Sequence, residues 1–334
     1  MRAIAILGAG SFGTALAAHL ALSGHRVRLW ARDAVLAADI ARRRANPVYL
    51  PDVTLPTAID VGADLPHALA DAEMVVVAVP SHGVRRVIDA ARSRIAPGTI
   101  VVSTTKGLEE GTLLRMSALL AGTLGPDVPV AAVSGPSFAA EVAKGLPTAV
   151  VAAADDARVV ALVQKEFRGS YLRVYGSHDV VGVEIGGALK NVIAIAAGVV
   201  EGTGLGANAQ AALITRGLAE ITRLAVALGG RRETLAGLAG LGDLVLTCTG
   251  ALSRNRHVGM ELAAGRGLEE VVGSMKMVAE GVRTTQAALA LGARHGVELP
   301  IAAQMADVLA GRKDARTALQ DLMLRPQRAE VDAG

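Results

Sequence analysis

Near its amino terminus the chain passes from a short apolar segment, residues 3–7, directly into the turn Gly8-Ala9-Gly10-Ser11-Phe12-Gly13. The apolar spacing predicts a buried strand before this turn and a helix over residues 14–22 after it. In a dinucleotide-binding turn, glycines let the backbone approach a pyrophosphate, and the start of the helix offers unpaired N–H groups. We therefore expect Gly8, Gly10 and Gly13 to bind a dinucleotide, with an ordinary glycine-rich turn as the alternative.

The pattern beyond this turn predicts an α/β region followed by a helical one. Short apolar segments at residues 27–30, 74–79, 99–103, 128–134, 148–153 and 172–175 alternate with helical stretches, which is typical of crossover units. From about residue 178 the strand signals end and helical spacing continues to the carboxyl terminus. The length of 334 residues fits about two domains. We predict a Rossmann-type domain with a mostly parallel sheet over residues 1–180 and an all-helical domain over 181–334.

Composition excludes several classes of protein. Hydrophobic residues make up 51% of the chain and charged residues 19%, which is not the balance of a disordered protein. The Phe, Tyr and Trp residues number only seven, which argues against binding by base stacking. The formal net charge is only +3 and the densest basic run is residues 42–44, so we expect no nucleic-acid partner.

The first part of the chain also has some features of a secretory signal. Residues 3–22 carry no Asp, Glu, Lys or Arg, and Ala15-Leu16-Ala17 resembles a signal-peptidase site. The glycine turn interrupts this run, and no other stretch of about 18 uninterrupted apolar residues exists, so we expect no membrane span. The single cysteine, Cys248, cannot form an intrachain disulfide, and the histidines lack metal-ligand spacing. These features favour a cytoplasmic protein without a bound metal.

Two neighbouring residues after the second predicted strand favour different nicotinamide cofactors. Asp33 is suited to the ribose hydroxyls of NAD, but it could equally cap the following helix. Arg32 is suited to the additional phosphate of NADP. We expect NADP and keep NAD as the alternative.

Polar residues follow three predicted strands, at the edge where open parallel sheets bind their ligands. Lys106 comes after the strand at 99–103, and Gly135 and Ser137 come after the strand at 128–134. We expect Lys106 to reach a bound ligand or cofactor, and the region of Gly135 and Ser137 to donate hydrogen bonds. For Ser81 and His82, which follow the strand at 74–79, turn and capping roles explain the residues at least as well.

Lys190 is the only charged residue between Glu184 and Glu201, inside an apolar helical stretch. Helical spacing places Gly186 and Gly187 on its side of the helix, where a ligand or another backbone could approach closely. A desolvated lysine has a lowered pKa and can act as an acid or a base near neutral pH. We favour a catalytic role over the alternative, an ammonium group that extends out of the helix to solvent.

Two features further along the chain could complete such a site. Asp243 is a lone carboxylate in a glycine-rich apolar run and could hold a lysine in place. The cluster Ser253-Arg254-Asn255-Arg256 concentrates hydrogen-bond donors, and arginine favours bidentate contact with phosphate. Taken alone, this cluster would be interpreted as a solvated loop.

Several collinear motifs are shared with one enzyme family. They are GAGSFGTALA from Gly8, STTKGLE from Ser103, SGPSFAAEVAKGLPTA from Ser134, GVEIGGALKNVIAI from Gly182, GLGDLVLTCT from Gly240, SRNR from Ser253 and AEG from Ala279. From Gly8 to about residue 300, the chain resembles the NAD(P)-dependent sn-glycerol-3-phosphate dehydrogenases.

The resemblance implies a reaction and a set of site residues. The reaction is hydride transfer between C4 of the nicotinamide and C2 of dihydroxyacetone phosphate, giving sn-glycerol 3-phosphate for glycerophospholipid synthesis. Lys190 would exchange the proton with the C2 oxygen, Asp243 would orient it, and Lys106 would lie at substrate and cofactor. The other matching substrate positions are Gly135, Ser137, Ser253, Arg254 (at the phosphate) and Asn255. Matching cofactor positions, besides the glycines of the turn, are Ser11, Phe12, Arg32, Ala139, Arg254, Val278 and Glu280.

Two details of the resemblance concern variation and assembly. Phe12 stands where many bacterial members have Trp or Tyr, so the ring is retained without its polar contact. The family also varies at Arg32, which leaves the choice between NADP and NAD open. The habits of the family imply a homodimer.

Two other functions stay open from the sequence. One is a related two-domain dehydrogenase acting on a β-hydroxy acid or ketopantoate, against which the phosphate-suited cluster at 253–255 argues. The other is a non-catalytic dinucleotide-binding sensor, which would not need Lys190 in an apolar helix with Asp243 as a candidate partner.

Overall fold

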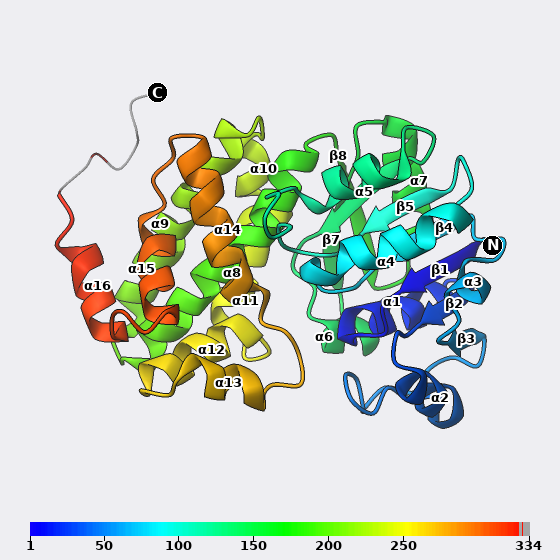
Figure 1. Cartoon of the computed structure of the whole chain (residues 1–334), viewed down its shortest axis with the longest axis horizontal. Helices are drawn as coiled ribbons and strands as arrows, with labels where there is room; N and C mark the ends of the chain where they lie inside the picture. The colour runs from blue at the N-terminus through cyan, green and yellow to red at the C-terminus, as the bar shows by residue number, and fades with distance from the viewer. Residues whose placement is uncertain (327–328, 330–334) are drawn as a thin grey trace.

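The computed structural model describes residues 1–326 and 329, and its amino-terminal half is a sheet with helices on both faces (Figure 1). The strands are β1 Ala3–Leu7, β2 Arg26–Trp30, β3 Ile59–Gly62, β4 Met74–Val77, β5 Ile100–Ser103, β6 Val130–Ser134, β7 Thr148–Ala153 and β8 Leu172–Ser177. The helices between them are α1 Ser11–Leu22, α2 Ala34–Arg43, α3 Leu65–Leu69, α4 Val84–Ala91, α5 Met116–Leu124, α6 Ala139–Ala143 and α7 Ala157–Phe167, with single 3₁₀ turns at Ser81–Gly83 and Arg92–Arg94.

The strands lie in the order β3-β2-β1-β4-β5-β6-β7-β8. Strand β1 pairs in parallel with β2 on one side and β4 on the other, so that Ile4 lies opposite Val27 and Met74. The exception to the parallel arrangement is β7, which runs antiparallel to β6 and parallel to β8. The predicted mostly parallel sheet followed by helices is therefore confirmed. The prediction omitted β3 because its four residues lack an apolar run. In the structure only the first of them, Ile59, is buried.

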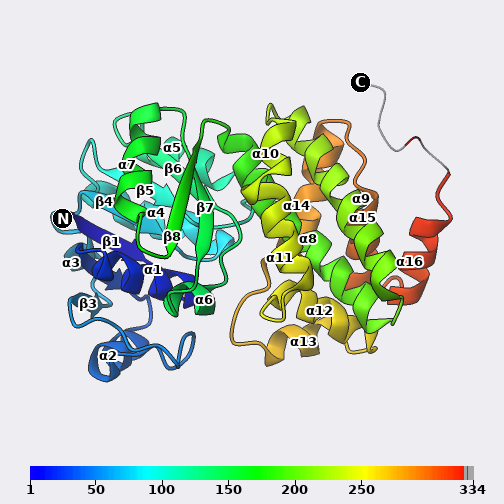
Figure 2. The ribbon, with the colours of Figure 1, turned by 180° about the vertical axis from the view of Figure 1, so that it is seen from behind.

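Both faces of the sheet are covered, because a parallel sheet is crossed by helices on each side. On one face, Ile6 packs in the same core as Leu16 of α1 and Phe167 of α7 (Figure 2). On the other face, Leu7 packs with Ile88 of α4 (Figure 1). This two-sided burial explains why the interior strands have continuous apolar sequences.

The rest of the described chain is helical, with α8 in its centre (Figures 1 and 2). The helices are α8 Val180–Gly202, α9 Gly206–Ala227, α10 Arg232–Ala236, α11 Asp243–Thr249, α12 Arg254–Ala263, α13 Leu268–Ser274, α14 Glu280–Arg294, α15 Pro300–Leu309 and α16 Ala315–Met323, with a π-helical turn at Leu238–Gly242. The sheet ends at Ser177 and α8 begins at Val180. Two separate domains divided between residues 180 and 181 remain a prediction.

Helix α8 is long and apolar enough to cross a membrane by length and composition. Of its most apolar 18-residue window, however, 89% is buried inside the protein. A helix that is apolar on all sides is expected in the core of a large helical bundle as well as in a membrane. The apolar sequence of α8 is therefore explained by the helices that surround it.

Helices α8 and α12 cross at glycines. A Cβ atom on Gly198 would lie 1.9 Å from the carbonyl oxygen of Arg256, and one on Gly259 would lie 1.9 Å from that of Ile195. Real side chains cannot occupy those positions, so the two backbones approach closely only because both residues are glycines. This crossing places the amino-terminal end of α12, with the Ser-Arg-Asn cluster, beside α8.

Replacing Gly259 by alanine is expected to lower the free energy of unfolding by about 1–3 kcal/mol, because the added methyl group must separate two packed backbones. Urea unfolding of the purified variant measures the change. Gly122 in α5 is a matched control, since nothing lies within 4 Å of its Cβ position. Gly122→Ala should leave stability equal or raise it by about 0.5–1 kcal/mol. Equal stability of the two variants would contradict the packing argument.

A buried carboxylate fixes α8 against the sheet region. Glu184 accepts hydrogen bonds from the backbone N–H of Ser117 at 2.8 Å and from Nη1 of Arg115 at 2.6 Å. Ser117 lies in the first turn of α5, where unpaired N–H groups favour a negative charge. Lys190, six residues further along α8, is thereby held near the ends of β5 and β6.

Candidate active site

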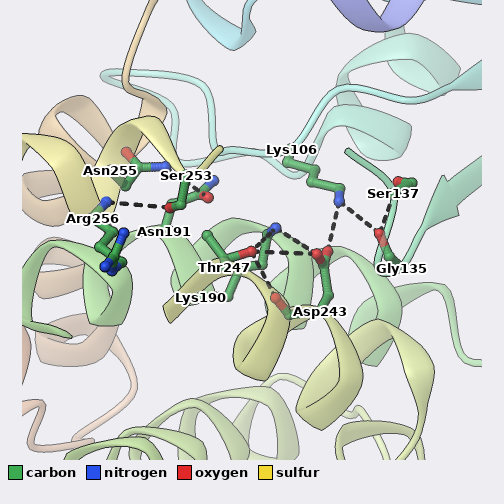
Figure 3. Close-up of polar contacts among 10 residues, drawn as sticks. All are labelled: Lys106, Gly135, Ser137, Lys190, Asn191, Asp243, Thr247, Ser253, Asn255 and Arg256. Atoms are coloured by element: carbon green, nitrogen blue, oxygen red, sulfur yellow. Dashed lines mark hydrogen bonds and ion pairs between the residues drawn. The ribbon is translucent and has the colours of Figure 1, made fainter. Parts of the chain in front are cut away.

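Lys190 belongs to a hydrogen-bonded cluster that is centred on Asp243 and joins the sheet region to the helical region (Figure 3). Its Nζ donates to Oδ1 of Asp243 and to Oγ1 of Thr247, both at 2.6 Å. The Thr247 hydroxyl in turn donates to the backbone carbonyl of Asp243 at 2.6 Å. Asp243 and Thr247 are one turn apart on α11, so both face Lys190. The sequence reasoning missed Thr247, although its i+4 spacing from Asp243 was a usable signal.

Lys106 completes the cluster from the loop after β5. Its Nζ donates to Oδ2 of Asp243 at 2.6 Å and to the carbonyl oxygen of Gly135 at 3.0 Å. Gly187 of α8 lies beside this loop: a Cβ there would lie at an ordinary contact distance of 3.5 Å from Cγ of Lys106 but only 2.5 Å from Oγ of Ser134, so the end of β6 approaches α8 closely only because residue 187 is glycine. The expectation that Asp243 could hold a lysine agrees with this geometry, since Asp243 contacts two.

The three charged side chains differ in their contact with water. The Asp243 side chain is 1% exposed, that of Lys190 is 7% exposed, and that of Lys106 is 20% exposed. The pKa of Lys190 is lowered to about 7, mainly by burial and in smaller part by Lys106, against the opposing effect of the Asp243 carboxylate. Lys190 can therefore exchange a proton near neutral pH, as expected of a desolvated lysine.

The loop after β6 forms a second wall of the cluster. Gly135 has a φ angle of +135° and lies 3.0 Å, by its Cβ position, from Cα of Val150, so a side chain would be strained and crowded. Its carbonyl oxygen accepts from Lys106, and also from the Ser137 hydroxyl at 2.9 Å. The predicted substrate residues Gly135 and Ser137 thus lie beside Lys106.

The Ser-Arg-Asn cluster begins α12, and its members have different surroundings. Ser253 is the N-cap, accepting from the backbone N–H of Arg256 at 3.2 Å. Asn255 is buried, donating to Oδ1 of Asn191 at 2.9 Å and accepting from the N–H of Gly281 at 2.9 Å. Asn191, which the sequence reasoning missed, follows Lys190 directly. The cluster is thus a capped helix start adjoining the Lys190 helix, where a solvated loop had been the alternative.

Arg254 has protein on several sides but stays in contact with solvent. The surrounding protein lowers the pKa of its guanidinium group, while the Glu280 carboxylate opposes that shift. At any ordinary pH the side chain remains a cation, since the pKa of a free guanidinium lies far above neutrality. Among Ser253, Arg254 and Asn255, it is the member open to a ligand.

The glycine turn has the backbone that a dinucleotide requires. Gly8 has a φ angle of +117°, and a Cβ on Gly13 would lie 2.0 Å from the Gly8 carbonyl oxygen, so both positions require glycine. At Gly10 no other part of the described chain lies within 4 Å of a Cβ position, which leaves the backbone open. Helix α1 begins at the next residue, Ser11. Close glycines, an open backbone and a helix start fit a pyrophosphate.

Arg32 and Asp33, which we expect to distinguish NADP from NAD, lie just after the end of β2. Asp33 is the N-cap of α2, accepting from the N–H groups of Val35 at 2.8 Å and Leu36 at 3.2 Å. The capping alternative is therefore what the structure has. Arg32 is exposed beside it.

The other predicted cofactor positions come from α1, α6 and the segment before α14. Phe12 and Ala139 are half-buried against the core that contains α1. Val278 is half-buried and lies between α13 and α14. Glu280, the first residue of α14, accepts from the N–H of Ser81 at 3.0 Å and from its hydroxyl at 2.5 Å. Ser81 therefore joins the end of β4 to the helical region, a role beyond the turn expected for it.

Two models of known protein families match this chain, one over the sheet region and one over the helical region. A model of the NAD-dependent glycerol-3-phosphate dehydrogenase N-terminus matches residues 3–160, and one of the C-terminus of the same enzymes matches residues 179–320. The chain belongs to the NAD-dependent glycerol-3-phosphate dehydrogenase family. The expected resemblance, enzyme class and fold class are thereby confirmed.

Individual relatives match over nearly their whole length. Glycerol-3-phosphate dehydrogenase (NAD(P)+) from Koribacter versatilis is 52% identical over 99% of this chain and 99% of the relative. The protein of that name from Acidobacterium capsulatum is also 52% identical, over 99% and 100%. The crystal structure of glycerol-3-phosphate dehydrogenase from Coxiella burnetii superposes with a TM-score of 0.94 at 41% identity, covering 97% of this chain and 99% of that one.

Proposed function

We propose that this chain catalyses the reversible NAD(P)H-dependent reduction of dihydroxyacetone phosphate to sn-glycerol 3-phosphate. Family membership supports the reaction, and the contact of Lys190, Asp243 and Lys106 supports the mechanism. The observation that carries the proposal is a buried lysine with a pKa of about 7 in direct contact with a buried carboxylate. The dinucleotide supplies the hydride when it is bound.

In the direction of reduction, the Lys190 ammonium group would donate its proton to the C2 oxygen of the substrate. In the reverse direction, the neutral amine would accept that proton. Asp243 would orient Nζ of Lys190 through the 2.6 Å contact and keep its pKa from falling further. Lys106, the more exposed cation, would stabilise the negative charge that develops on the C2 oxygen.

The substrate phosphate would bind at the start of α12. Arg254 is exposed there, and Ser253 and Asn255 flank it. A guanidinium group can contact two phosphate oxygens at once. Gly135 and Ser137 would contact the remainder of the substrate beside Lys106.

Replacing Arg254 by alanine is expected to raise the KM for dihydroxyacetone phosphate roughly 10- to 100-fold, because a charged hydrogen-bonding partner of the phosphate is lost. kcat should stay within about fivefold, since Arg254 is not proposed to move a proton. Steady-state kinetics measure both, and inorganic phosphate should inhibit the variant more weakly than the parent. The control is Arg266→Ala, which removes a surface arginine paired with Glu261 and Glu270. An unchanged KM in the Arg254 variant would contradict the assignment.

The dinucleotide would lie across the glycine turn, with Ser11, Phe12, Ala139, Val278 and Glu280 around it. We propose NADP as the preferred form because Arg32 is exposed at the end of β2 and Asp33 is engaged as a helix cap. NAD remains the alternative.

One assay separates this function from the other candidates. Oxidation of NADPH and of NADH is followed with dihydroxyacetone phosphate and, separately, with ketopantoate as a non-phosphorylated keto acid. We expect oxidation with dihydroxyacetone phosphate only, and faster with NADPH. Oxidation with ketopantoate alone would favour the related dehydrogenase class. Dinucleotide binding with no turnover of either compound would favour a sensor.

Three wider expectations remain proposals. They are supply of the glycerophospholipid backbone, a cytoplasmic location and a homodimer. Light scattering after gel filtration measures the oligomeric state directly.

A further inference from the structure

Within the loop between α2 and β3, the side chain of Asn46 bonds directly to the glycine turn, and the function proposed above does not use this residue. Asn46 is fully buried. Its amide nitrogen donates to the carbonyl oxygen of Ala9 and to the hydroxyl of Thr14, both at 2.9 Å. Its amide oxygen accepts from the N–H groups of Val48 at 3.3 Å and Tyr49 at 3.1 Å. Both hydrogens and both acceptor positions of the amide are therefore used.

The bond to Ala9 decides where the next N–H group of the turn points. The Ala9 carbonyl and the Gly10 N–H belong to one trans peptide, and the two groups of such a peptide point in opposite directions. Anchoring the carbonyl on Asn46 therefore directs the Gly10 N–H to the opposite side of the turn. Gly10 is the residue whose Cβ position has open space around it.

Asn46 also acts on the hydroxyl at the start of α1. The bonds accepted by its amide oxygen, with the bond from the Leu50 N–H to its own carbonyl at 3.0 Å, fold the loop into a tight turn. The Tyr49 carbonyl in this turn accepts from Oγ of Ser11 at 2.9 Å. Ser11 lies at the helix terminus that favours an anion.

We propose that Asn46 is a positioning residue for the diphosphate group of the dinucleotide. It acts through the Ala9–Gly10 peptide and through Ser11, and touches no reacting atom. The inference rests on the proposed function only for the kind of ligand. Because NAD and NADP share the diphosphate, loss of the Asn46 amide must weaken both, whereas a change at Arg32 would affect mainly NADP.

The test is direct titration of Asn46→Asp with NADPH and with NADH, followed by the fluorescence of the bound dinucleotide. The carboxylate is similar in shape but cannot donate to the Ala9 carbonyl. We expect the Kd of both dinucleotides to rise roughly 10- to 100-fold. kcat at saturating NADPH and the KM for dihydroxyacetone phosphate should change less than about twofold. Thr14→Val is the matched control, because it removes the other acceptor of the same amide and leaves the Ala9 bond, so its Kd values should stay within about threefold.

Asn46→Ser distinguishes the effect of the bond to the glycine turn from the effect of the bonds within the loop. It also serves as the test if Asn46→Asp does not fold. Its hydroxyl oxygen can still accept from the loop N–H groups but is too short to reach Ala9, so it should show the same loss of affinity. Parent-like Kd values in either folded variant would overturn the proposal. Weakening of NADPH alone would overturn it as well, as would an equal loss of cofactor affinity, substrate affinity and kcat. The titration needs no substrate, so its result stands even if the parent protein does not reduce dihydroxyacetone phosphate.

Discussion

Lys190→Met is expected to lower kcat for the reduction of dihydroxyacetone phosphate by about 10³-fold, within the range that a positioned acid or base contributes. Methionine fills a similar volume but carries no proton for the C2 oxygen. The buried Asp243 carboxylate keeps Lys106 as a partner at 2.6 Å, so the variant is not left with an isolated buried charge. The Kd for NADPH should therefore stay within about threefold of the parent value. Steady-state kinetics at saturating substrates and a separate NADPH titration provide the two readouts.

Lys165→Met is the control for loss of a lysine, since Lys165 is exposed on α7. It should leave kcat and the NADPH Kd unchanged. Activity of Lys190→Met close to that of this control would remove Lys190 from the mechanism.

The pH dependence of the parent enzyme follows from the same residue. Reduction requires the Lys190 ammonium form, so kcat/KM should be high below pH 7 and fall as the pH rises through about 7. Oxidation of sn-glycerol 3-phosphate requires the neutral amine, so its kcat/KM should rise over the same interval. We therefore expect kcat/KM to change with pH in opposite senses for reduction and oxidation. Neither change should appear in the residual activity of Lys190→Met. Limbs that persist in the variant would assign the titration to another group.

Asp243→Asn is expected to lower kcat for reduction by about 10²-fold at pH 7.5, because a smaller fraction of Lys190 will be protonated. The Asp243 carboxylate raises the pKa of Lys190, whereas burial and Lys106 lower it. Without the negative charge, two ammonium groups face each other and the pKa of Lys190 must fall below about 7. The descending limb of the reduction profile should therefore move to lower pH, and part of the lost activity should return on acidification.

The measurement is a full pH profile of kcat/KM in both directions, with unfolding followed in parallel. Asp307→Asn is the matched control, because Asp307 pairs with Arg312 and Lys313 at the surface. That variant should keep the parent profile. A uniform loss for Asp243→Asn with no movement of the limb would show that Asp243 orients Lys190 without affecting its proton.

The sequence predicted individual chemical groups better than their contacts. Lys190 was identifiable because a lone charge in an apolar helix is conspicuous, and Asp243 because it is the single carboxylate of an apolar run. Their contact, and that of Asp243 with Lys106, was only a possibility from the sequence. The three residues are far apart along the chain, and apolar periodicity carries no information about which helix packs against which strand.

The roles of Asp33 and Asn46 depend on hydrogen bonds that the sequence does not specify. Asp33 had two explanations, and the helix cap prevailed because the N–H groups of Val35 and Leu36 lie at hand. Asn46 gave no signal at all, since an asparagine before Pro47 reads as an ordinary loop residue. Its importance arises from burial against a turn that lies more than thirty residues earlier.

The sequence by itself determined the glycine turn, the mostly parallel sheet followed by helices, and the family, because these depend on local spacing and collinear motifs. Only the tertiary structure decided that Lys190 shares Asp243 with Lys106, that α8 and α12 meet at glycines, and that Asn46 bonds to the Ala9 carbonyl of the glycine turn. The physical reason is the same in each case. Desolvation and close packing depend on neighbours distant in the chain, and these alone place the pKa of Lys190 at about 7.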